Sequence, residues 1–191
     1  MNGYDLMLKM NSAKNLPEVV LLDINMPVVD GVCVAFYLSY HFPQVKIIAL
    51  STYDSLKMIV NIMHSGTVGY LLKTNMESLL DEAISQVLAG KVFLDPRIEL
   101  DEQQLYNLVV KKHENSFKKG NAFGLTAREA TFVILNATML TYDQIAKIMF
   151  VETKTIQTYF DRVSKKLNLN SRQALTIYSI QNGLSKLAFY S

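Results

Sequence analysis

Three side chains in the first half of the sequence have the types that phosphoryl transfer requires. Asp23, Ser51 and Lys73 each come directly after a short apolar segment. A carboxylate can act as a nucleophile toward phosphorus, while a hydroxyl and an ammonium group can stabilise the oxygens of the transferred phosphoryl group. Any one of these residues alone would more often be a helix cap or a solvated loop residue. Their recurrence after three successive segments is what indicates a phosphoryl site.

The apolar segments predict the scaffold that would bring these side chains together. The run at 19–22 is continuous and of strand length, which is typical of a strand buried on both faces of a parallel sheet. Further strands are expected at 45–50 and 68–72, and helical patterns at 31–40, 55–64 and 76–89. Strands alternating with helices predict right-handed βαβ units and a doubly wound parallel sheet. Since the carboxyl ends of parallel strands meet at one edge, the three side chains would share a shallow cleft.

Composition and charge are those of an ordinary globular protein. The 191 residues are 50% hydrophobic and 19% charged, with one Cys, which excludes collagen, disulfide scaffolds and long disordered tails. Residues 1–100 carry 7 Lys or Arg against 10 Asp or Glu, whereas residues 121–191 carry 8 against 4. The basic second half favours nucleic acid as its partner. Because neither a signal sequence nor an apolar run of about 20 residues is visible, we expect a cytoplasmic protein with no membrane partner.

The last third of the sequence is helical in pattern throughout. Thr126 and Glu129 form one capping box, Thr141 and Gln144 form a second, and each box opens a helix. A third helix is expected at 153–167, with an apolar stripe on one side and a polar, mostly basic face on the other. Two short helices joined by a tight turn are typical of a helix-turn-helix. A small helical bundle with a solvated face would have the same pattern.

A polar, basic stretch separates the two halves of the chain. Residues 97–112 suit an amphipathic linker helix, and residues 113–121 have no periodic pattern. We therefore predict a first domain at 1–96, a linker helix and loop at 97–121, and an all-α domain at 122–191.

The residues around Asp23 resemble a known family. Their order, Pro-Glu-Val-Val-Leu-Leu-Asp-Ile-Asn-Met-Pro-Val-Val-Asp-Gly, is similar to the phosphoacceptor segment of bacterial response-regulator receiver domains, whose fold is flavodoxin-like. The resemblance implies that Asp23 is phosphorylated and that, with the backbone carbonyl of Asn25, it binds Mg²⁺. It also implies that Ser51 reports phosphorylation, that Tyr70 is the switch aromatic and that Lys73 is the lysine of the phosphoryl site.

The sequence also departs from the receiver pattern. Receiver domains carry a pair of acidic residues after their first strand, which hold Mg²⁺ through carboxylate oxygens. Here the family's first strand, first helix and second strand have no counterpart, since residues 2–5 resemble the start of its second helix. We therefore expect a truncated receiver with an incomplete sheet, weak or absent Mg²⁺ binding, poor phosphotransfer and an unpaired apolar edge at 19–22. An upstream start codon or a truncated gene is favoured over a missing unit supplied by another chain.

The second domain resembles the LuxR/NarL-type DNA-binding domain. The resemblance rests on Leu-Thr-Ala-Arg-Glu at 125–129, Lys-Thr-Ile-Gln-Thr-Tyr at 154–159 and Lys-Leu-Asn-Leu-Asn-Ser-Arg-Gln-Ala at 166–174. It implies that the helix at 153–167 is the recognition helix, which lies in the DNA major groove. DNA contacts are expected from its outer residues, namely Lys154, Thr155, Gln157, Thr158, Asp161, Arg162, Lys165 and Lys166.

Two of these residues depart from the family pattern. Gln157 stands where the family usually has a base-facing lysine, and glutamine prefers adenine edges to guanine edges. Asp161, one turn further on, repels phosphate or accepts a hydrogen bond from cytosine. Phosphate anchoring then rests on Lys154, Arg162, Lys165 and Lys166, with Arg172 as a further candidate. We therefore expect weaker, strongly salt-dependent DNA binding and an altered target sequence.

Together these patterns predict a DNA-binding response regulator that controls transcription and is no enzyme beyond the receiver's own phosphotransfer. A sensor histidine kinase would phosphorylate Asp23, and a homodimer would bind double-stranded DNA. A phosphatase of the haloacid dehalogenase type is disfavoured, because Asn25 stands where that class needs an acidic general acid. The remaining alternative is a phosphorylation-independent DNA-binding or interaction protein with a degenerate receiver.

Overall fold

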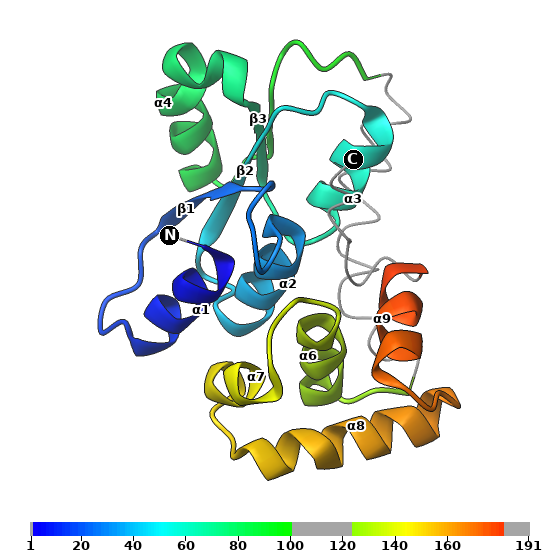
Figure 1. Cartoon of the computed structure of the whole chain (residues 1–191). Helices are drawn as coiled ribbons and strands as arrows, with labels where there is room; N and C mark the ends of the chain where they lie inside the picture. The colour runs from blue at the N-terminus through cyan, green and yellow to red at the C-terminus, as the bar shows by residue number, and fades with distance from the viewer. Residues whose placement is uncertain (1, 101–123, 182–191) are drawn as a thin grey trace. The chain divides into compact units, whose positions relative to one another are not determined.

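The computed structural model describes residues 2–100 and 124–181, and Figure 1 shows its helices and strands. It contains two compact units. Within the described residues, the sheet unit comprises 15–25 and 35–100, and the helical unit comprises 2–14, 26–34 and 124–181. Most of the linker predicted at 97–121 lies outside the described residues, and the predicted domain boundaries stay predictions.

The sheet unit is built on four parallel strands in the order β1-β2-β3-β4. The strands are β1 (Val19–Asp23), β2 (Lys46–Ser51), β3 (Gly69–Leu72) and β4 (Phe93–Leu94). Their register pairs Asp23 with Leu50 and Ser51 with Leu72, so that β1, β2 and β3 end along one edge of the sheet. The predicted parallel sheet is confirmed, and the two-residue β4 is a strand that the sequence pattern does not predict.

Helix α4 (Met76–Leu88) covers one face of this sheet. Its Ala83 and Val87 pack with Leu71 of β3 and Phe93 of β4 in a buried apolar cluster. This packing gives the short β4 its place in the sheet, because two residues form too few ladder hydrogen bonds to hold a strand by themselves.

The remaining helices of the first half are α2 and α3. Figure 1 shows α3 (Leu56–Met63) on the side of the sheet away from α4, as a doubly wound sheet requires. Helix α2 (Gly31–His41) crosses the boundary between the two units. A short 3₁₀ helix, η1 (Lys73–Asn75), joins β3 to α4.

The burial of β1 differs from the prediction made for it. Val20 and Leu22 are buried, but Leu21 between them is 40% exposed. The face of β1 on which Leu21 lies is therefore partly open to solvent. The continuous apolar sequence of β1 predicts a strand buried on both faces, but the structure buries only the face that carries Val20 and Leu22.

The helical unit contains α1 (Gly3–Ser12), α6 (Ala127–Asn136), α7 (Tyr142–Met149), α8 (Thr153–Leu167) and α9 (Arg172–Gln181). Both predicted capping boxes are present. Thr126 accepts a hydrogen bond from the Glu129 amide, and Thr141 accepts one from the Gln144 amide. Fully buried side chains from four helices form the core beneath them, including Phe132, Ile145, Ile156, Val163 and Leu175. Across the described residues, no helix is both long and apolar enough to pass through a bilayer.

Candidate functional site

The carboxyl ends of β1 and β3 bring Asp23 and Lys73 into contact. The Nζ of Lys73 lies 2.7 Å from Oδ2 of Asp23. The other carboxylate oxygen, Oδ1, accepts a hydrogen bond of 2.9 Å from the backbone N–H of Asn25. Both charged side chains are about one-third exposed, so a phosphoryl donor in solution can reach the carboxylate. A nucleophile beside a fixed ammonium group suits phosphoryl transfer, because the ammonium stabilises the charge on the phosphoryl oxygens.

Ser51 and Tyr70 both bind the backbone of Tyr53, in the loop after β2. The fully buried Ser51 accepts a hydrogen bond of 3.1 Å at Oγ from the Tyr53 N–H. The hydroxyl of Tyr70, whose side chain is also fully buried, donates a bond of 2.6 Å to the Tyr53 carbonyl. Burial raises the pKa of Tyr70 more than the nearby Ser51 hydroxyl lowers it, so the phenol stays protonated and remains a donor. These two predicted residues therefore meet at one loop, next to the strand ends that carry Asp23 and Lys73.

A buried carboxylate that the sequence patterns do not predict binds the residues on either side of Lys73. Asp95, just after β4, is fully buried and accepts hydrogen bonds of 3.0 Å from the backbone N–H groups of Leu72 and Arg97. It also accepts bonds of 2.8 and 2.9 Å from the side-chain amide of Asn75. Asp95 thus holds both ends of the segment on which Lys73 lies. The sequence signal that could have found it is an Asp-Pro pair directly after a short apolar run.

The loop that follows Asp23 contains a strained residue. Val28 has a left-handed backbone with φ of 71°, and its side chain is 37% exposed. A Cβ in this region approaches the following carbonyl oxygen, which costs roughly 1–2 kcal/mol, and branching at Cβ adds to the crowding. The loop between β1 and α2 therefore stores backbone strain five residues after Asp23 in the sequence.

We expect Val28→Gly to raise the free energy of unfolding by about 1 kcal/mol, because glycine relieves the strain while adding some unfolded-chain entropy. Urea unfolding of the full chain, followed by circular dichroism, measures this change. Val29→Gly is the matched control. Val29 is fully buried and has no positive φ, so the same replacement there should destabilise the protein. A Val28→Gly midpoint at or below that of the unchanged protein would contradict the strain.

The described residues do not fit a Mg²⁺ ion at Asp23. Mg²⁺ takes six oxygen ligands in near-ideal octahedral geometry and is usually held through carboxylates. At Asp23, one carboxylate oxygen binds the Lys73 ammonium and the other accepts the Asn25 amide. Among residues 2–100 and 124–181, no three His, Cys, Asp or Glu side chains are grouped closely enough to hold a metal ion. The cation that faces Asp23 is the Lys73 side chain.

Helices α7 and α8 have the predicted helix-turn-helix arrangement. Helix α7 ends at Met149, and its C-cap residue Phe150 has a left-handed backbone (φ of 52°) that turns the chain toward α8. The Oγ1 of Thr153 donates a bond of 2.6 Å to Oδ1 of Asp143, which joins the first turns of the two helices. Since Ile156 and Val163 are buried in the unit's core, the opposite side of α8 faces outward.

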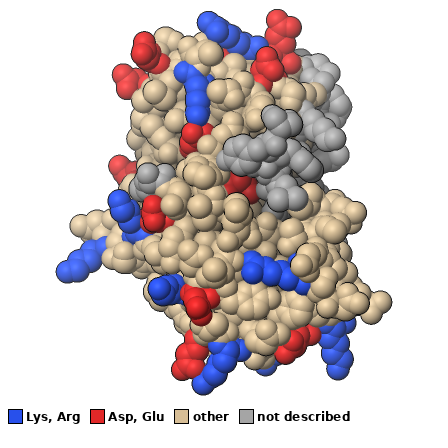
Figure 2. Space-filling view, in the orientation of Figure 1, with Lys and Arg blue, Asp and Glu red and all other residues tan. Residues whose placement is uncertain are grey.

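The outward side of α8 carries the residues expected to contact DNA. Thr155 is half-buried, and the others are exposed, namely Lys154, Gln157, Thr158, Asp161, Arg162, Lys165 and Lys166. Figure 2 shows Lys and Arg interspersed with Asp and Glu over this helix, at the lower edge of the view. The ion pair between Lys154 and Glu152, with N and O 2.6 Å apart, is almost fully solvated and therefore weak. Acidic groups thus divide the basic side chains of this face.

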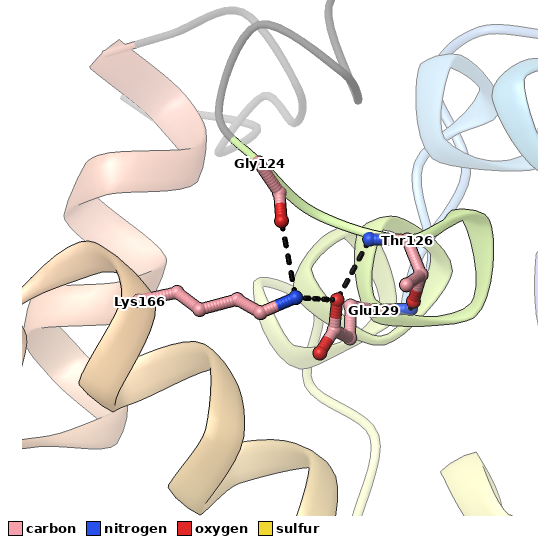
Figure 3. A network of polar contacts seen from close by, with 4 residues as sticks. All are labelled: Gly124, Thr126, Glu129 and Lys166. Carbon is pink, nitrogen blue, oxygen red and sulfur yellow. Dashed lines mark hydrogen bonds and ion pairs between the residues drawn. The ribbon is translucent and has the colours of Figure 1, made fainter.

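Lys166 differs from the other basic residues of α8 because its ammonium group binds within the unit. Its Nζ lies 2.7 Å from Oε2 of Glu129 and 3.0 Å from the carbonyl oxygen of Gly124, two contacts that can be followed in Figure 3. Oε2 of Glu129 also accepts a bond of 2.7 Å from the Thr126 N–H, and its side chain is only 5% exposed. Burial alone would raise the pKa of Glu129, but the bonds from Lys166 and Thr126 outweigh it and lower the pKa. The first turn of α6 and the last turn of α8 are thus joined by one ion pair.

Arg172, the further candidate for phosphate anchoring, also binds within the unit. Its guanidinium group donates to the carbonyl oxygen of Leu140 and lies over the ring of Tyr142, 5.0 Å from the ring centre. Among the described residues, Arg162 and Lys165 have no ion-pair partner. These two side chains are therefore the basic groups of α8 that are most available to a phosphate backbone.

Both halves of the chain match families of known proteins. Residues 1–85 match the model of the response regulator receiver domain, and residues 124–179 match that of the bacterial regulatory proteins of the luxR family. The transcriptional regulatory protein LnrK of Bacillus subtilis is 30% identical over 178 residues, which cover 91% of this chain and 80% of LnrK. The transcriptional regulatory protein DegU of Brevibacillus brevis is 29% identical over 195 aligned residues, covering 97% of this chain and 80% of DegU.

Among solved structures, the chain is similar to the RcsB response regulator of Salmonella typhimurium. The two are 22% identical and superpose with a TM-score of 0.47, covering 93% of this chain and 81% of the RcsB chain.

Proposed function

Because the chain belongs to the DNA-binding transcriptional response regulators, with a receiver domain and a LuxR-type DNA-binding domain, we propose that phosphorylation of Asp23 controls its binding to DNA. A sensor histidine kinase supplies the phosphoryl group, and the active form is a homodimer on double-stranded DNA in the cytoplasm. The observation that carries this proposal is the contact of 2.7 Å between the Asp23 carboxylate and the Lys73 ammonium.

In the transfer step, a carboxylate oxygen of Asp23 forms a bond to phosphorus as the bond from phosphorus to the kinase histidine nitrogen breaks. The released histidine nitrogen takes up a proton, and an acyl phosphate remains on Asp23. Lys73 moves from the carboxylate oxygen to the new phosphoryl oxygens, where its ammonium stabilises their negative charge. Asp95 keeps the Lys73 segment in place while the ammonium changes partner.

The loop after β2 carries the proposed signal from Asp23 to the surface. Two hydrogen bonds hold Tyr53 in this loop, one to the Ser51 hydroxyl and one from the Tyr70 hydroxyl. When Ser51 turns to donate its hydroxyl hydrogen to a phosphoryl oxygen, the bond to the Tyr53 N–H is lost. The loop then takes up a second arrangement, which is the kind of order change that switches such proteins.

Binding to DNA uses the outward side of α8 in the major groove. The exposed side chains in the first turns of this helix support this proposal, because a recognition helix contacts bases mainly with its N-terminal residues. Arg162 and Lys165 contact phosphates, which makes the affinity fall as the salt concentration rises.

Incubation of the full chain with acetyl phosphate is expected to add the mass of one phosphoryl group, and Asp23→Asn is expected to abolish this addition. The amide is not a nucleophile toward phosphorus, although it keeps the size of the carboxylate. Intact mass spectrometry measures the change. Asp54→Asn, at an exposed carboxylate in the loop after β2, is the matched control and should be labelled like the unchanged protein. Labelling of Asp23→Asn at the unchanged rate would overturn the assignment of Asp23.

A regulator that acts without phosphorylation is the second candidate. It is favoured by the state of Asp23, whose two carboxylate oxygens are both engaged by groups of the chain itself. The same incubation separates the two candidates when it is followed by a DNA-binding measurement. No labelling, with DNA binding unchanged by acetyl phosphate, would favour the second.

A further inference from the structure

We propose that Gln157 and Asp161 act as a pair that selects bases carrying an amino group in the major groove, and that Asp161 fixes the orientation in which Gln157 reads adenine. The inference rests on the proposed placement of α8 in the major groove. The preferred bases present an amino group in the major groove, at N6 of adenine or N4 of cytosine. The disfavoured bases present a carbonyl oxygen there, at O6 of guanine or O4 of thymine.

The two side chains are exposed on the same side of α8, one helical turn apart. Nε2 of Gln157 donates a hydrogen bond of 3.1 Å to Oδ1 of Asp161. Residues four apart on a helix are neighbours on its surface, so this contact needs no distortion of the backbone. The buried residues Ile156 and Val163 lie on the opposite side of the helix, which leaves the pair free to face a ligand.

The hydrogen bond to Asp161 fixes the orientation of the Gln157 side-chain amide. An ionised carboxylate can only accept hydrogen bonds, so the NH₂ group of the amide must face Asp161 and the carbonyl oxygen must face away. The carbonyl oxygen and the second N–H of Gln157 then remain available together for hydrogen bonds to a base edge. Adenine presents the complementary set, an amino donor at N6 and an acceptor at N7.

Guanine does not fit this arrangement. Its major-groove edge presents two acceptors, O6 and N7, and O6 would face the carbonyl oxygen of Gln157. The second carboxylate oxygen of Asp161 adds a further acceptor, which favours a cytosine or adenine amino group at the neighbouring base pair and repels a carbonyl oxygen. Both residues therefore oppose the bases that a lysine or an arginine at the same place would choose.

Basic side chains lie one turn away on either side of this pair. Lys154 precedes Gln157 by three residues and is paired with Glu152, while Lys165 follows Asp161 by four. Asp143, the other carboxylate near the start of α8, accepts the Thr153 hydroxyl and does not compete for the Gln157 amide. The outward side of α8 thus carries the hydrogen-bonding pair Gln157 and Asp161 at its centre and a lysine one turn away on either side. This arrangement suits contacts to base edges at the centre and to phosphates at both ends.

The test is selection of binding sites by the full chain from a pool of duplex DNA with random sequence. We expect adenine or cytosine at two adjacent positions of one strand. In the selected site, replacing the adenine by purine, which lacks the 6-amino group, or by 7-deazaadenine, which lacks the N7 acceptor, should weaken binding about 10-fold each. Gln157→Lys should shift that position to guanine.

Asp161→Asn tests the positioning role. The asparagine amide can donate as well as accept, so the orientation of Gln157 is no longer fixed, and the preference for adenine over guanine should fall about 10-fold. Affinity for unrelated duplex should stay the same or rise, because a negative charge has been removed. Asp81→Asn, the same change at an exposed site on α4, is the matched control and should keep the wild-type preference.

Two results would overturn the inference by different routes. If the full chain binds duplex DNA but Gln157→Lys and Asp161→Asn select the same sequence as the wild type, the pair does not read bases, and the proposed DNA binding stands. If the wild type binds no duplex at any salt concentration, the proposed function fails, and the inference fails with it.

Discussion

Replacing Glu129 by alanine is expected to lower the free energy of unfolding by about 2–3 kcal/mol. The substitution removes an almost fully buried carboxylate that accepts bonds from the Lys166 ammonium and the Thr126 N–H. Breaking a buried pair leaves one partner uncompensated, and Lys166 in turn loses its anchor between α6 and α8. Because Lys166 is 39% exposed and can be resolvated, the expected cost lies below that of a fully buried pair.

Urea unfolding of the full chain, followed by circular dichroism, measures this loss. Faster hydrogen exchange in α6 and α8, with unchanged exchange in β2, would locate it in the helical unit. Gln144→Ala is the matched control, because Gln144 has the same position in the second capping box but is only half-buried and has no cationic partner among the described residues. It should cost less than about 1 kcal/mol. Equal losses for Glu129→Ala and Gln144→Ala would show that the ion pair adds nothing to the cap.

The same ion pair makes the stability of the helical unit depend on pH. The pKa of Glu129 is lower in the folded protein than its ordinary value of 4.5. A carboxyl group with a lowered pKa contributes stability that is fully present above its unfolded pKa and is lost as the pH falls through its folded pKa. Glu129→Gln should therefore reduce the loss of stability below about pH 4.5 relative to the unchanged protein.

Replacing Asp95 by alanine is expected to cost about 3 kcal/mol and to impair phosphorylation as well. The change leaves the N–H groups of Leu72 and Arg97 and the amide of Asn75 without acceptors in a buried place. Each unsatisfied buried donor costs roughly 1–3 kcal/mol, although water that enters the vacated space recovers part of this. The segment that carries Lys73 then loses its fixed position beside Asp23, so phosphoryl transfer should slow even where the fold survives.

Asp95→Asn separates the two effects. The asparagine keeps the volume and one acceptor oxygen, so the loss of stability should be smaller, about 1–2 kcal/mol. The measurements are urea unfolding and the rate of labelling by acetyl phosphate, and the exposed Asp81→Ala is the control for both. A full loss of stability with an unchanged labelling rate would contradict the positioning of Lys73 by Asp95.

Local patterns in the sequence predict most of the elements because the forces behind them are local. Thr126 and Glu129 of the first capping box are only three positions apart, so both members can be read from the sequence together. The apolar runs that precede Asp23, Ser51 and Lys73 likewise predict β1, β2 and β3 within about two residues at each end.

Features that depend on tertiary contacts could not be predicted in the same way. Lys166 binds Glu129 across 37 residues of sequence, and Arg172 binds Leu140 across 32, so no spacing rule connects the members of either pair. Helix α8 therefore looks more basic in sequence than it is in the folded protein. The exposure of Leu21 has the same origin, because an apolar run gives no information on how completely other elements will cover each face of the strand.

The engagement of Lys166 by Glu129 has a consequence for how the protein searches a genome. Each phosphate contact releases a counterion, so a lysine held by a carboxylate of its own domain removes about one unit from the slope of log affinity against log salt. The protein therefore stays bound to non-specific DNA for a shorter time, and fewer of its molecules are held on unrelated sequence. Occupancy of a promoter then depends more on the bases that α8 meets and less on the length of DNA around them.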